Sequence, residues 1–145
     1  MAYNVEDIAN RLLVWSEESG ELLSNMKLQK LLYYEQGFHL AYFGTPLFDD
    51  DMEAWMYGPV VPSIYHKYEE FGKDAIHGDS NNVIYFEDDQ EERLFDEVFD
   101  LYSRYSAVYL SRMTHEEEPW KSTGVGRGNI IEKSKLLTFF KTRLK

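Results

Sequence analysis

The chain has 145 residues, a net charge of −11 at pH 7 and no cysteine. Its length suits one domain with its own core, since such domains commonly hold about 100 to 150 residues, and we therefore expect a single domain over 1–145. The negative charge disfavours direct binding to nucleic acid or to an anionic membrane, and the absence of thiols excludes disulfides, cysteine nucleophiles and thiolate metal sites.

The N-terminal residues 1–7 lack the basic and then apolar order of a signal peptide. No uninterrupted apolar run approaches the roughly 20 residues that a membrane-spanning helix needs. We therefore predict a cytoplasmic protein.

The first third of the chain predicts two helices. Asn4 can cap a first helix that ends near Gly20. A second helix begins at Ser24 or the next residue and runs towards Gly44. A helix that is apolar nearly all round is usually central and buried. We place the second helix at the middle of the fold because its apolar residues cover far more than one stripe: Leu28, Leu31, Leu32, Tyr34, Phe38, Leu40, Ala41 and Phe43.

The middle of the chain predicts short extended segments. Residues 53–57 are expected to form a strand or small hairpin, and Pro62 suits the first turn of a third helix that could run to Gly72. Residues 83–86 (VIYF) predict a second short strand. The expected fold is therefore a mainly α, compact single-domain helical fold with a central buried helix and a minor two-stranded β element.

Three further helices are predicted in the C-terminal half. Asp88 with Glu91 resembles a capping box, and Ser106 can cap a shorter helix that runs through Met113. A glycine-containing loop follows, and residues 129 and 132 offer a cap for a last helix that carries Ile130, Leu137, Phe140 and Leu144. The helix after Asp88 has the clearest apolar face of the chain: Leu94, Phe95, Val98, Leu101, Tyr102 and Tyr105.

Three spaced blocks carry a family resemblance. They are residues 27–34 (KLQKLLYY), residues 54–62 (AWMYGPVVP) and residues 110–115 (LSRMTH), the last leading to Pro119 and Trp120. In this order they resemble the Panacea domain, an antitoxin-associated family that includes SocA-like and phage-associated proteins. The resemblance implies a bacterial or prophage antitoxin that binds a cognate protein toxin directly and is not an enzyme. A SocA-like relative acts as an adaptor that delivers its toxin to a protease, and the residues do not separate adaptor from blocker.

The second block supplies the first candidate partner contacts: Trp55, Tyr57, Gly58 and Pro59. An extended strand would send Trp55 and Tyr57 to one side, and Trp and Tyr are enriched at interface hot spots. The alternative is that Trp55 plugs the core while residues 58–59 turn the chain into the next helix. Trp120, in the third block, completes the expected aromatic contact, and nearby acids at 49–51 and 116–118 would steer a basic partner.

Polar residues on the central helix have two interpretations. Gln29, Tyr33 and Gln36 share one helical face, and a buried polar group must find hydrogen-bond partners. An internal network that braces neighbouring loops is favoured over a polar recognition surface. Lys27 and Lys30 are expected at a solvated helix start.

His115 stands directly before three glutamates and supports an alternative of another class. It could serve a small hydrolase or metal-dependent enzyme with Glu116 or Glu118, joined by His39 or His66. The histidine spacings match no zinc motif, so a structural role or a partner contact is favoured for His115. No cofactor is expected, because the glycines at 124–128 lack the Gly-Lys-Ser/Thr ending of a phosphate loop. The acidic runs are expected to be solvated.

Overall fold

The computed structural model describes residues 2–144 and is mainly helical, as predicted. Within these residues the chain forms seven α-helices, one short 3-10 helix and three strands. In chain order they are α1 Val5–Glu18, α2 Asn25–Phe43, β1 Met52–Trp55, β2 Gly58–Val60, α3 Pro62–Tyr68, η1 Glu69–Phe71, α4 Asp89–Tyr102, α5 Ala107–His115, α6 Glu118–Lys121, β3 Ile130–Ile131 and α7 Lys133–Lys141.

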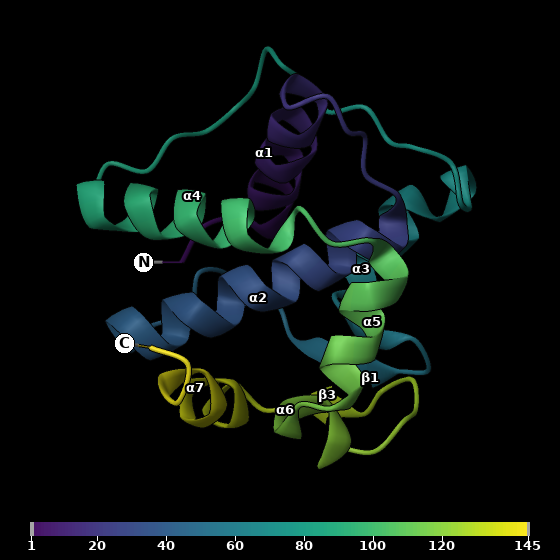
Figure 1. The fold of residues 1–145 in the computed structure, drawn as a ribbon, viewed down its shortest axis with the longest axis vertical. Coiled ribbons are helices and arrows are strands. Elements are labelled where there is room, and N and C mark those ends of the chain that lie inside the picture. Colours follow the sequence, from purple (N-terminus) through teal and green to yellow (C-terminus); the bar gives the residue numbers. More distant parts are fainter. Residues whose placement is uncertain (1, 145) are drawn as a thin grey trace.

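Helix α2 crosses the centre of the molecule, which confirms the prediction of a central buried helix (Figure 1). Ser24 caps it by accepting a hydrogen bond from the Lys27 amide, and Gly44 ends it in the left-handed conformation at φ 77°. Every residue from 27 to 41 is buried. The helix contacts α1, α3, α4, α5, α7 and β2, so the core is organised around it.

Helices α1 and α4 cover one side of α2, and α7 covers the other (Figure 1). Asn4 and Asp88 cap α1 and α4 as predicted. The two helices are joined by Arg11, which is fully buried and binds both carboxylate oxygens of Glu92 at 2.6 and 2.7 Å. The Arg11 guanidinium carbon also lies 3.9 Å from the ring centroid of Trp15, so this charge is held between an acid and an aromatic face.

The sheet has three antiparallel strands in the order β2-β1-β3. The predicted element around residues 53–57 is confirmed as the β1–β2 hairpin. The third strand was not predicted: Ile130, expected on the last helix, pairs with Glu53 instead. Helix α7 begins after Glu132, whose side chain makes no capping hydrogen bond.

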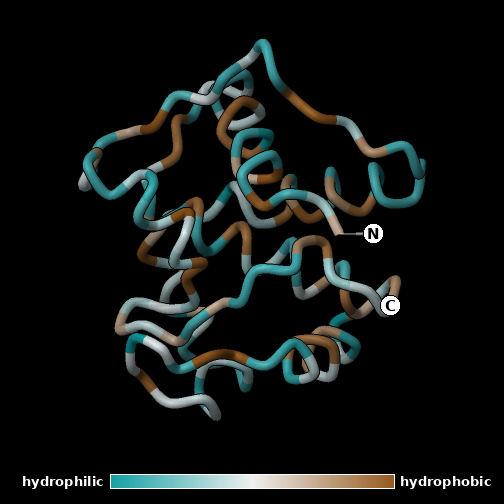
Figure 2. The backbone as a smooth tube through the Cα atoms, turned by 180° about the vertical axis from the view of Figure 1, so that it is seen from behind, coloured by the Kyte–Doolittle hydropathy of each residue, from teal (hydrophilic) through white to brown (hydrophobic). Residues whose placement is uncertain are grey.

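The predicted strand at residues 83–86 is wrong. These residues lie in the long connection between η1 and α4, where they form one hydrophobic stretch in a largely hydrophilic arch (Figure 2). The Phe86 amide donates to Glu92 at 2.7 Å instead of to a neighbouring strand. The Phe86 ring packs on Tyr3 and Phe95. The apolar pattern therefore marks residues that anchor a loop to the core.

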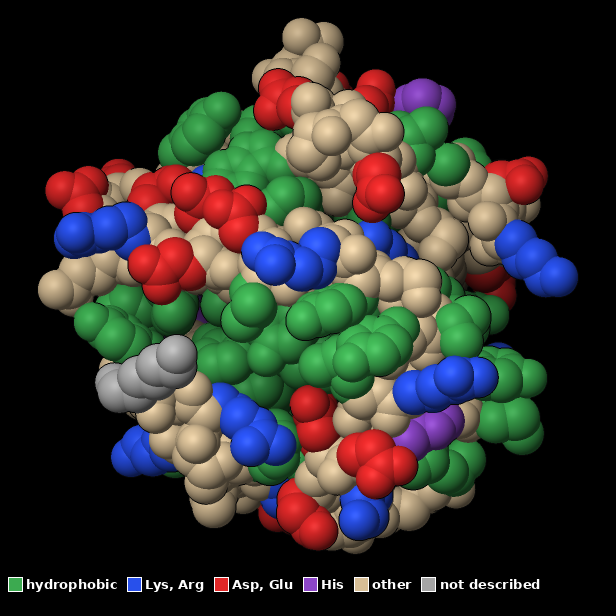
Figure 3. Space-filling model, in the orientation of Figure 1, with side chains coloured by type: hydrophobic (Ala, Val, Ile, Leu, Met, Phe, Trp, Pro, Cys, Tyr) green, Lys and Arg blue, Asp and Glu red, His purple; other side chains and the backbone are tan. Residues whose placement is uncertain are grey.

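One face of the molecule is rich in hydrophobic side chains (Figure 3). Hydrophobic side chains gather on one face between α4 and the α6–α7 end of the molecule, with acidic and basic side chains around them (Figure 3). None of the helices within residues 2–144 is both long and apolar enough to cross a membrane.

Candidate partner-binding site

The three sequence blocks meet at the β1–β2 hairpin. From the first block, Gln29 accepts a hydrogen bond from the Val61 amide at 2.8 Å and donates to Asn25 at 2.9 Å. Asn25 in turn donates to the Tyr65 carbonyl of α3 at 3.0 Å. The favoured interpretation of an internal bracing network is therefore correct for Gln29. Its partners explain why a polar residue is tolerated in a helix with no solvated face.

The other polar residues of that face brace further parts of the fold. Gln36 donates to the Phe48 carbonyl and accepts from the Leu47 amide, both at 2.7 Å, which fixes the loop after α2. Tyr33 bonds to Glu117 beyond α5. The central helix thus uses its polar side chains to hold loops on both sides.

The third block binds the hairpin from its other side. Ser111 of α5 donates to the Tyr57 carbonyl, and the Trp120 indole N–H donates to the Trp55 carbonyl at 2.8 Å. The contacts use hairpin backbone groups, so they fix the position of the turn without using its side chains. The blocks that carry the family resemblance are therefore parts of one assembly.

Lys30 is buried beneath the hairpin, and the prediction that it is solvated is wrong. Only 1% of the residue is exposed, and its Nζ donates to the Pro59 carbonyl at 3.2 Å. Burial lowers the pKa of Lys30 to about 7. Gly58 has a φ of 122°, and a Cβ there would lie 2.5 Å from Lys30 Cε and 2.8 Å from Thr114 Oγ1. Gly58 therefore leaves the space that the lysine side chain occupies.

Lys27 is buried as well, contrary to expectation. Its ammonium donates to the Ser103 carbonyl at 2.6 Å. The aliphatic stem packs at the start of α2 while the charge reaches a carbonyl at the end of α4. Both lysines are buried because helices and loops surround even the N-terminal turn of α2.

The two aromatic residues of the hairpin differ in exposure. Strand β1 ends at Trp55, so Tyr57 lies in the turn, where strand alternation does not apply. Trp55 is 9% exposed, and its ring packs edge-on against Tyr65 at 5.0 Å between centroids. The guanidinium carbon of Arg127 lies 4.2 Å from the Trp55 ring centroid. Tyr57, by contrast, is 62% exposed and free to meet a partner.

His115 and Trp120 form a stacked pair with ring centroids 4.0 Å apart. His115 Nε2 is buried and has no hydrogen-bond partner among residues 2–144. His39 instead bonds to Glu91 of α4 at 2.6 Å, and His66 lies on α3 beside Glu69. The three histidines named in the enzyme alternative therefore have different partners. Within the described range no group of three or more His, Asp or Glu side chains could hold a metal ion.

Glu117 is buried, and the prediction that this acidic run is solvated is wrong at its middle residue. Its carboxylate accepts hydrogen bonds from Tyr33 at 2.9 Å and from Tyr34 at 3.1 and 3.2 Å. Burial raises the pKa of Glu117 to about 7, although both tyrosine hydroxyls and the charge of Arg143 act in the opposite direction. The neighbouring Glu116 and Glu118 are exposed, as expected.

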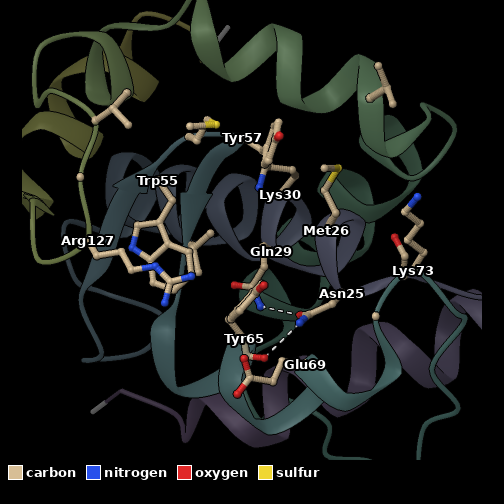
Figure 4. Close-up of a pocket in the computed structure, with 17 residues that line it drawn as sticks. Asn25, Met26, Gln29, Lys30, Trp55, Tyr57, Tyr65, Glu69, Lys73 and Arg127 are labelled. Atoms are coloured by element: carbon tan, nitrogen blue, oxygen red, sulfur yellow. Dashed lines mark hydrogen bonds between the residues drawn. The ribbon is translucent and has the colours of Figure 1, made fainter.

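A hollow of about 880 Å³ opens beside the hairpin (Figure 4). Its walls come from the N-terminal half of α2, the hairpin turn, α3 with η1, the start of α5 and the loop before β3. The lining is mostly apolar and includes four exposed hydrophobic side chains, which we call the apolar rim: Met56, Tyr57, Val108 and Val125. Charged side chains also line the hollow: Lys30, Glu69, Lys73 and Arg127.

The hollow contains some predicted partner residues and several that the sequence did not reveal. Trp55 and Tyr57 line it, whereas Gly58, Pro59 and Trp120 do not. Gly58 and Pro59 contact Lys30, and Trp120 bonds to the Trp55 carbonyl. His115 lines a separate, shallower hollow. Lys30 carried one usable signal, its position beside Leu31 and Leu32 in a helix that was predicted to be buried. The position of Arg127 had none, because it depends on the path of a glycine-containing loop.

Comparison with known proteins agrees with the resemblance carried by the three blocks. Residues 28–121 match the family described as "Antitoxin SocA-like, Panacea domain". The chain is 31% identical over 135 residues to "Antitoxin SocA" of Caulobacter vibrioides (strain NA1000 / CB15N), an alignment that covers 86% of this chain and 72% of that protein. No solved structure matches the chain. The matched segment contains the hairpin, α5 and most of α2, and the chain therefore belongs to the Antitoxin SocA-like, Panacea domain family.

Proposed function

We propose that this chain is an antitoxin that neutralises a cognate protein toxin by binding it directly, without chemical turnover. Membership of the family and the name of the Caulobacter relative support the antitoxin role. The burial of the three sequence blocks supports a folded binding module, because their polar groups hold the hairpin and α5 in fixed positions before any partner arrives. A preorganised surface loses little conformational entropy on binding.

The observation that carries this proposal is the apolar rim. Its four side chains, Met56, Tyr57, Val108 and Val125, are exposed and line one concave surface. Clustered exposed apolar side chains around a hollow are typical of protein–protein interaction sites. Tyr57 combines a large apolar surface with a hydroxyl, and tyrosine is frequent among the side chains that dominate binding energy.

The other predicted contact residues take supporting roles in this proposal. Trp55 forms a wall of the hollow, and Gly58, Pro59 and Trp120 hold the turn that presents Tyr57. His115 contributes by stacking on Trp120. Loss of Tyr57 should therefore weaken toxin binding through lost contact, and loss of Trp120 should act through displacement of the turn.

The test is co-purification with the toxin, taken as the product of the reading frame beside the gene. Met56→Asp and Val108→Asp place a charge on the apolar rim and should abolish capture of the toxin while the chain stays folded. Leu101→Asp is the matched control, because Leu101 is an exposed apolar residue of α4 that does not line the hollow. If both rim variants retain the toxin as well as Leu101→Asp does, the hollow is not the docking site.

Stoichiometry distinguishes binding from catalysis. Growth rescue and toxin inhibition should require at least one antitoxin per toxin, and His115→Ala should still neutralise if it folds. Rescue at a large excess of toxin, with turnover of a small molecule, would favour the enzyme alternative. Toxin lifetime in cells separates an adaptor, which shortens it, from a blocker, which leaves it unchanged.

A further inference from the structure

Lys30 is the most deeply buried charged residue that lines the hollow, since only 1% of it is exposed. A lysine ammonium has three N–H donors, and within residues 2–144 this one makes a single hydrogen bond, to the Pro59 carbonyl at 3.2 Å. Burying a charge without a counter-charge is costly, and the surrounding fold is nevertheless shaped to accept it, because Gly58 leaves room for its stem. Two donors therefore remain available at the base of an apolar hollow.

The charges around this group have the opposite sign to the molecule as a whole. Lys30, Lys73 and Arg127 line the hollow, and Glu69 is the one acid among its lining residues. Arg127 and Lys73 stand at opposite ends, with Lys30 between them (Figure 4). Within residues 2–144 none of the three cations forms an ion pair with an acid. The whole chain has a net charge of −11, so this cluster is a local exception.

We propose that the hollow binds an apolar segment of the toxin that carries a carboxylate, and that this carboxylate accepts the two unused N–H groups of Lys30. This inference rests on the proposed function and specifies the chemistry of the partner. A carboxylate bears one charge and loses its hydration more readily than a doubly charged phosphate, which fits walls that are mostly apolar. The apolar rim adds four exposed side chains to the same hollow, so a macromolecular segment explains more of the surface than a small acid does.

Such an occupant should change the protonation of Lys30. Burial lowers the pKa of Lys30 to about 7 in the free chain, whereas a carboxylate beside it favours the charged form. The other titratable or charged groups that line the hollow are Tyr57, Tyr65, Glu69, Lys73 and Arg127. On the elements against which Lys30 packs, β2 has no titratable side chain, and those of α5, Tyr109, Arg112 and His115, line the separate hollow. Binding above neutral pH should therefore be accompanied by proton uptake at Lys30.

The experiment uses 3-phenylpropionate as the probe and the neutral 3-phenylpropanamide as its matched control. Both are titrated into the full chain by calorimetry, with backbone chemical shifts to locate binding. We expect the acid to bind wild type at least about tenfold more tightly than the amide, with shifts centred on Met26, Met56 and Val108. Lys30→Met, which retains length and removes the charge, should lose this preference. At about pH 8, calorimetry in buffers of different ionisation heat should show proton uptake for wild type only.

Equal affinity of wild type for acid and amide would overturn the proposal, and this comparison requires no variant to fold. It would also be overturned by unchanged acid binding in Lys30→Met or by the absence of saturable acid binding. These failures are distinct from failure of the docking site. If Met56→Asp loses the toxin while acid and amide bind alike, the toxin docks at the apolar rim without a carboxylate at Lys30.

Discussion

Buried ionisable side chains are the most unusual residues of this molecule. They differ in how many hydrogen-bond or ion-pair partners offset the cost of their burial. Arg11 has a bidentate partner in Glu92. Glu117 has two tyrosine hydroxyls, whereas Lys30 has one carbonyl. Glu35 is also fully enclosed, with one carboxylate oxygen unpaired, and burial raises its pKa well above the usual range. A group with poor compensation shifts its pKa, so its contribution to the free energy of unfolding depends on pH.

Glu117 should make stability fall as pH rises. Because its pKa is about 7 in the fold and about 4.3 in an unfolded chain, the folded state retains a proton between these values that the unfolded state releases. This contribution is fully present below the unfolded value and is lost as pH rises through the folded one. Glu117→Gln, which can still accept both tyrosine hydrogen bonds, should gain up to about 3 kcal/mol relative to wild type between pH 4 and 8.

Denaturant unfolding at a series of pH values measures this gain. Glu35 remains in both proteins, so its titration cancels in the comparison. Stability curves for wild type and Glu117→Gln that run parallel across this pH range would contradict the assignment.

Close packing between α2 and α7 restricts which side chains can stand on the facing sides of the two helices. Helix α7 lies against it where a Cβ on Gly37 would fall 2.2 Å from the Phe140 ring. Gly37→Ala should therefore destabilise the fold, because overpacking costs about 1 to 3 kcal/mol and exceeds the gain of about 1 kcal/mol in helix propensity. Phe140→Leu should restore space, so the double variant should lose less stability than the sum of the single ones. Strict additivity would show that the two residues do not meet.

Helix α4 offers a matched pair of positions for testing its buried face. Val98 is 5% exposed, whereas Leu101, three residues later, is 46% exposed. Val98→Asp places an unpaired charge in the core and should unfold the chain, and Leu101→Asp should change stability by no more than about 0.5 kcal/mol. Circular dichroism and thermal melting distinguish the two. Equal stability of the variants would mean that the orientation of α4 is wrong.

Local sequence signals predicted where helices begin better than they predicted which residues are buried and which strands pair. Capping at Asn4, Asp88 and Ser106 is confirmed by hydrogen bonds in the structure, because a cap depends on residues two or three positions away. The apolar face of α4 was assigned correctly at Val98 and wrongly at Leu101, since period alone does not show where a neighbouring helix ends. The short strand β3 was missed because two residues carry no usable pattern and pair only through the hairpin.

The sequence indicated which blocks come together but not the shape of the hollow beside them. The family-like blocks do converge, as the sequence suggested, yet they do so largely through hydrogen bonds between side chains and backbone groups, which a motif does not display. Lys30 and Glu117 were expected in solvent because charged residues usually are. Their burial follows from long-range contacts, to Pro59 in one case and to Tyr33 and Tyr34 in the other.

For the whole molecule, the central position of α2 couples the site to the core. This helix supplies Lys30 and Gln29 to the hollow, and its opposite end packs on α4 and α7. A substitution in the core can therefore disturb the hollow without lying near it. Binding measurements on any variant must accordingly be paired with a measurement of folding.

The net charge of −11 predicts how a basic toxin would approach. Five of the six acids named as steering groups are exposed, at 49–51, 116 and 118, although Asp51 also pairs with Lys133 at 3.1 Å. Their field should accelerate encounter, so the association rate constant should fall as salt rises while dissociation changes less. The local cations of the hollow act only after contact, because screening limits the range of their electric field to about 10 Å at 0.1 M salt.

Surface plasmon resonance across a salt series tests this division of roles. The variant with Asp49→Asn, Asp50→Asn, Glu116→Gln and Glu118→Gln should associate more slowly at low salt and resemble wild type at high salt. Its dissociation rate should stay close to wild type, since these acids lie outside the hollow. An association rate independent of salt in wild type would show that the overall charge has no steering role. A faster dissociation of the variant would place these acids inside the interface.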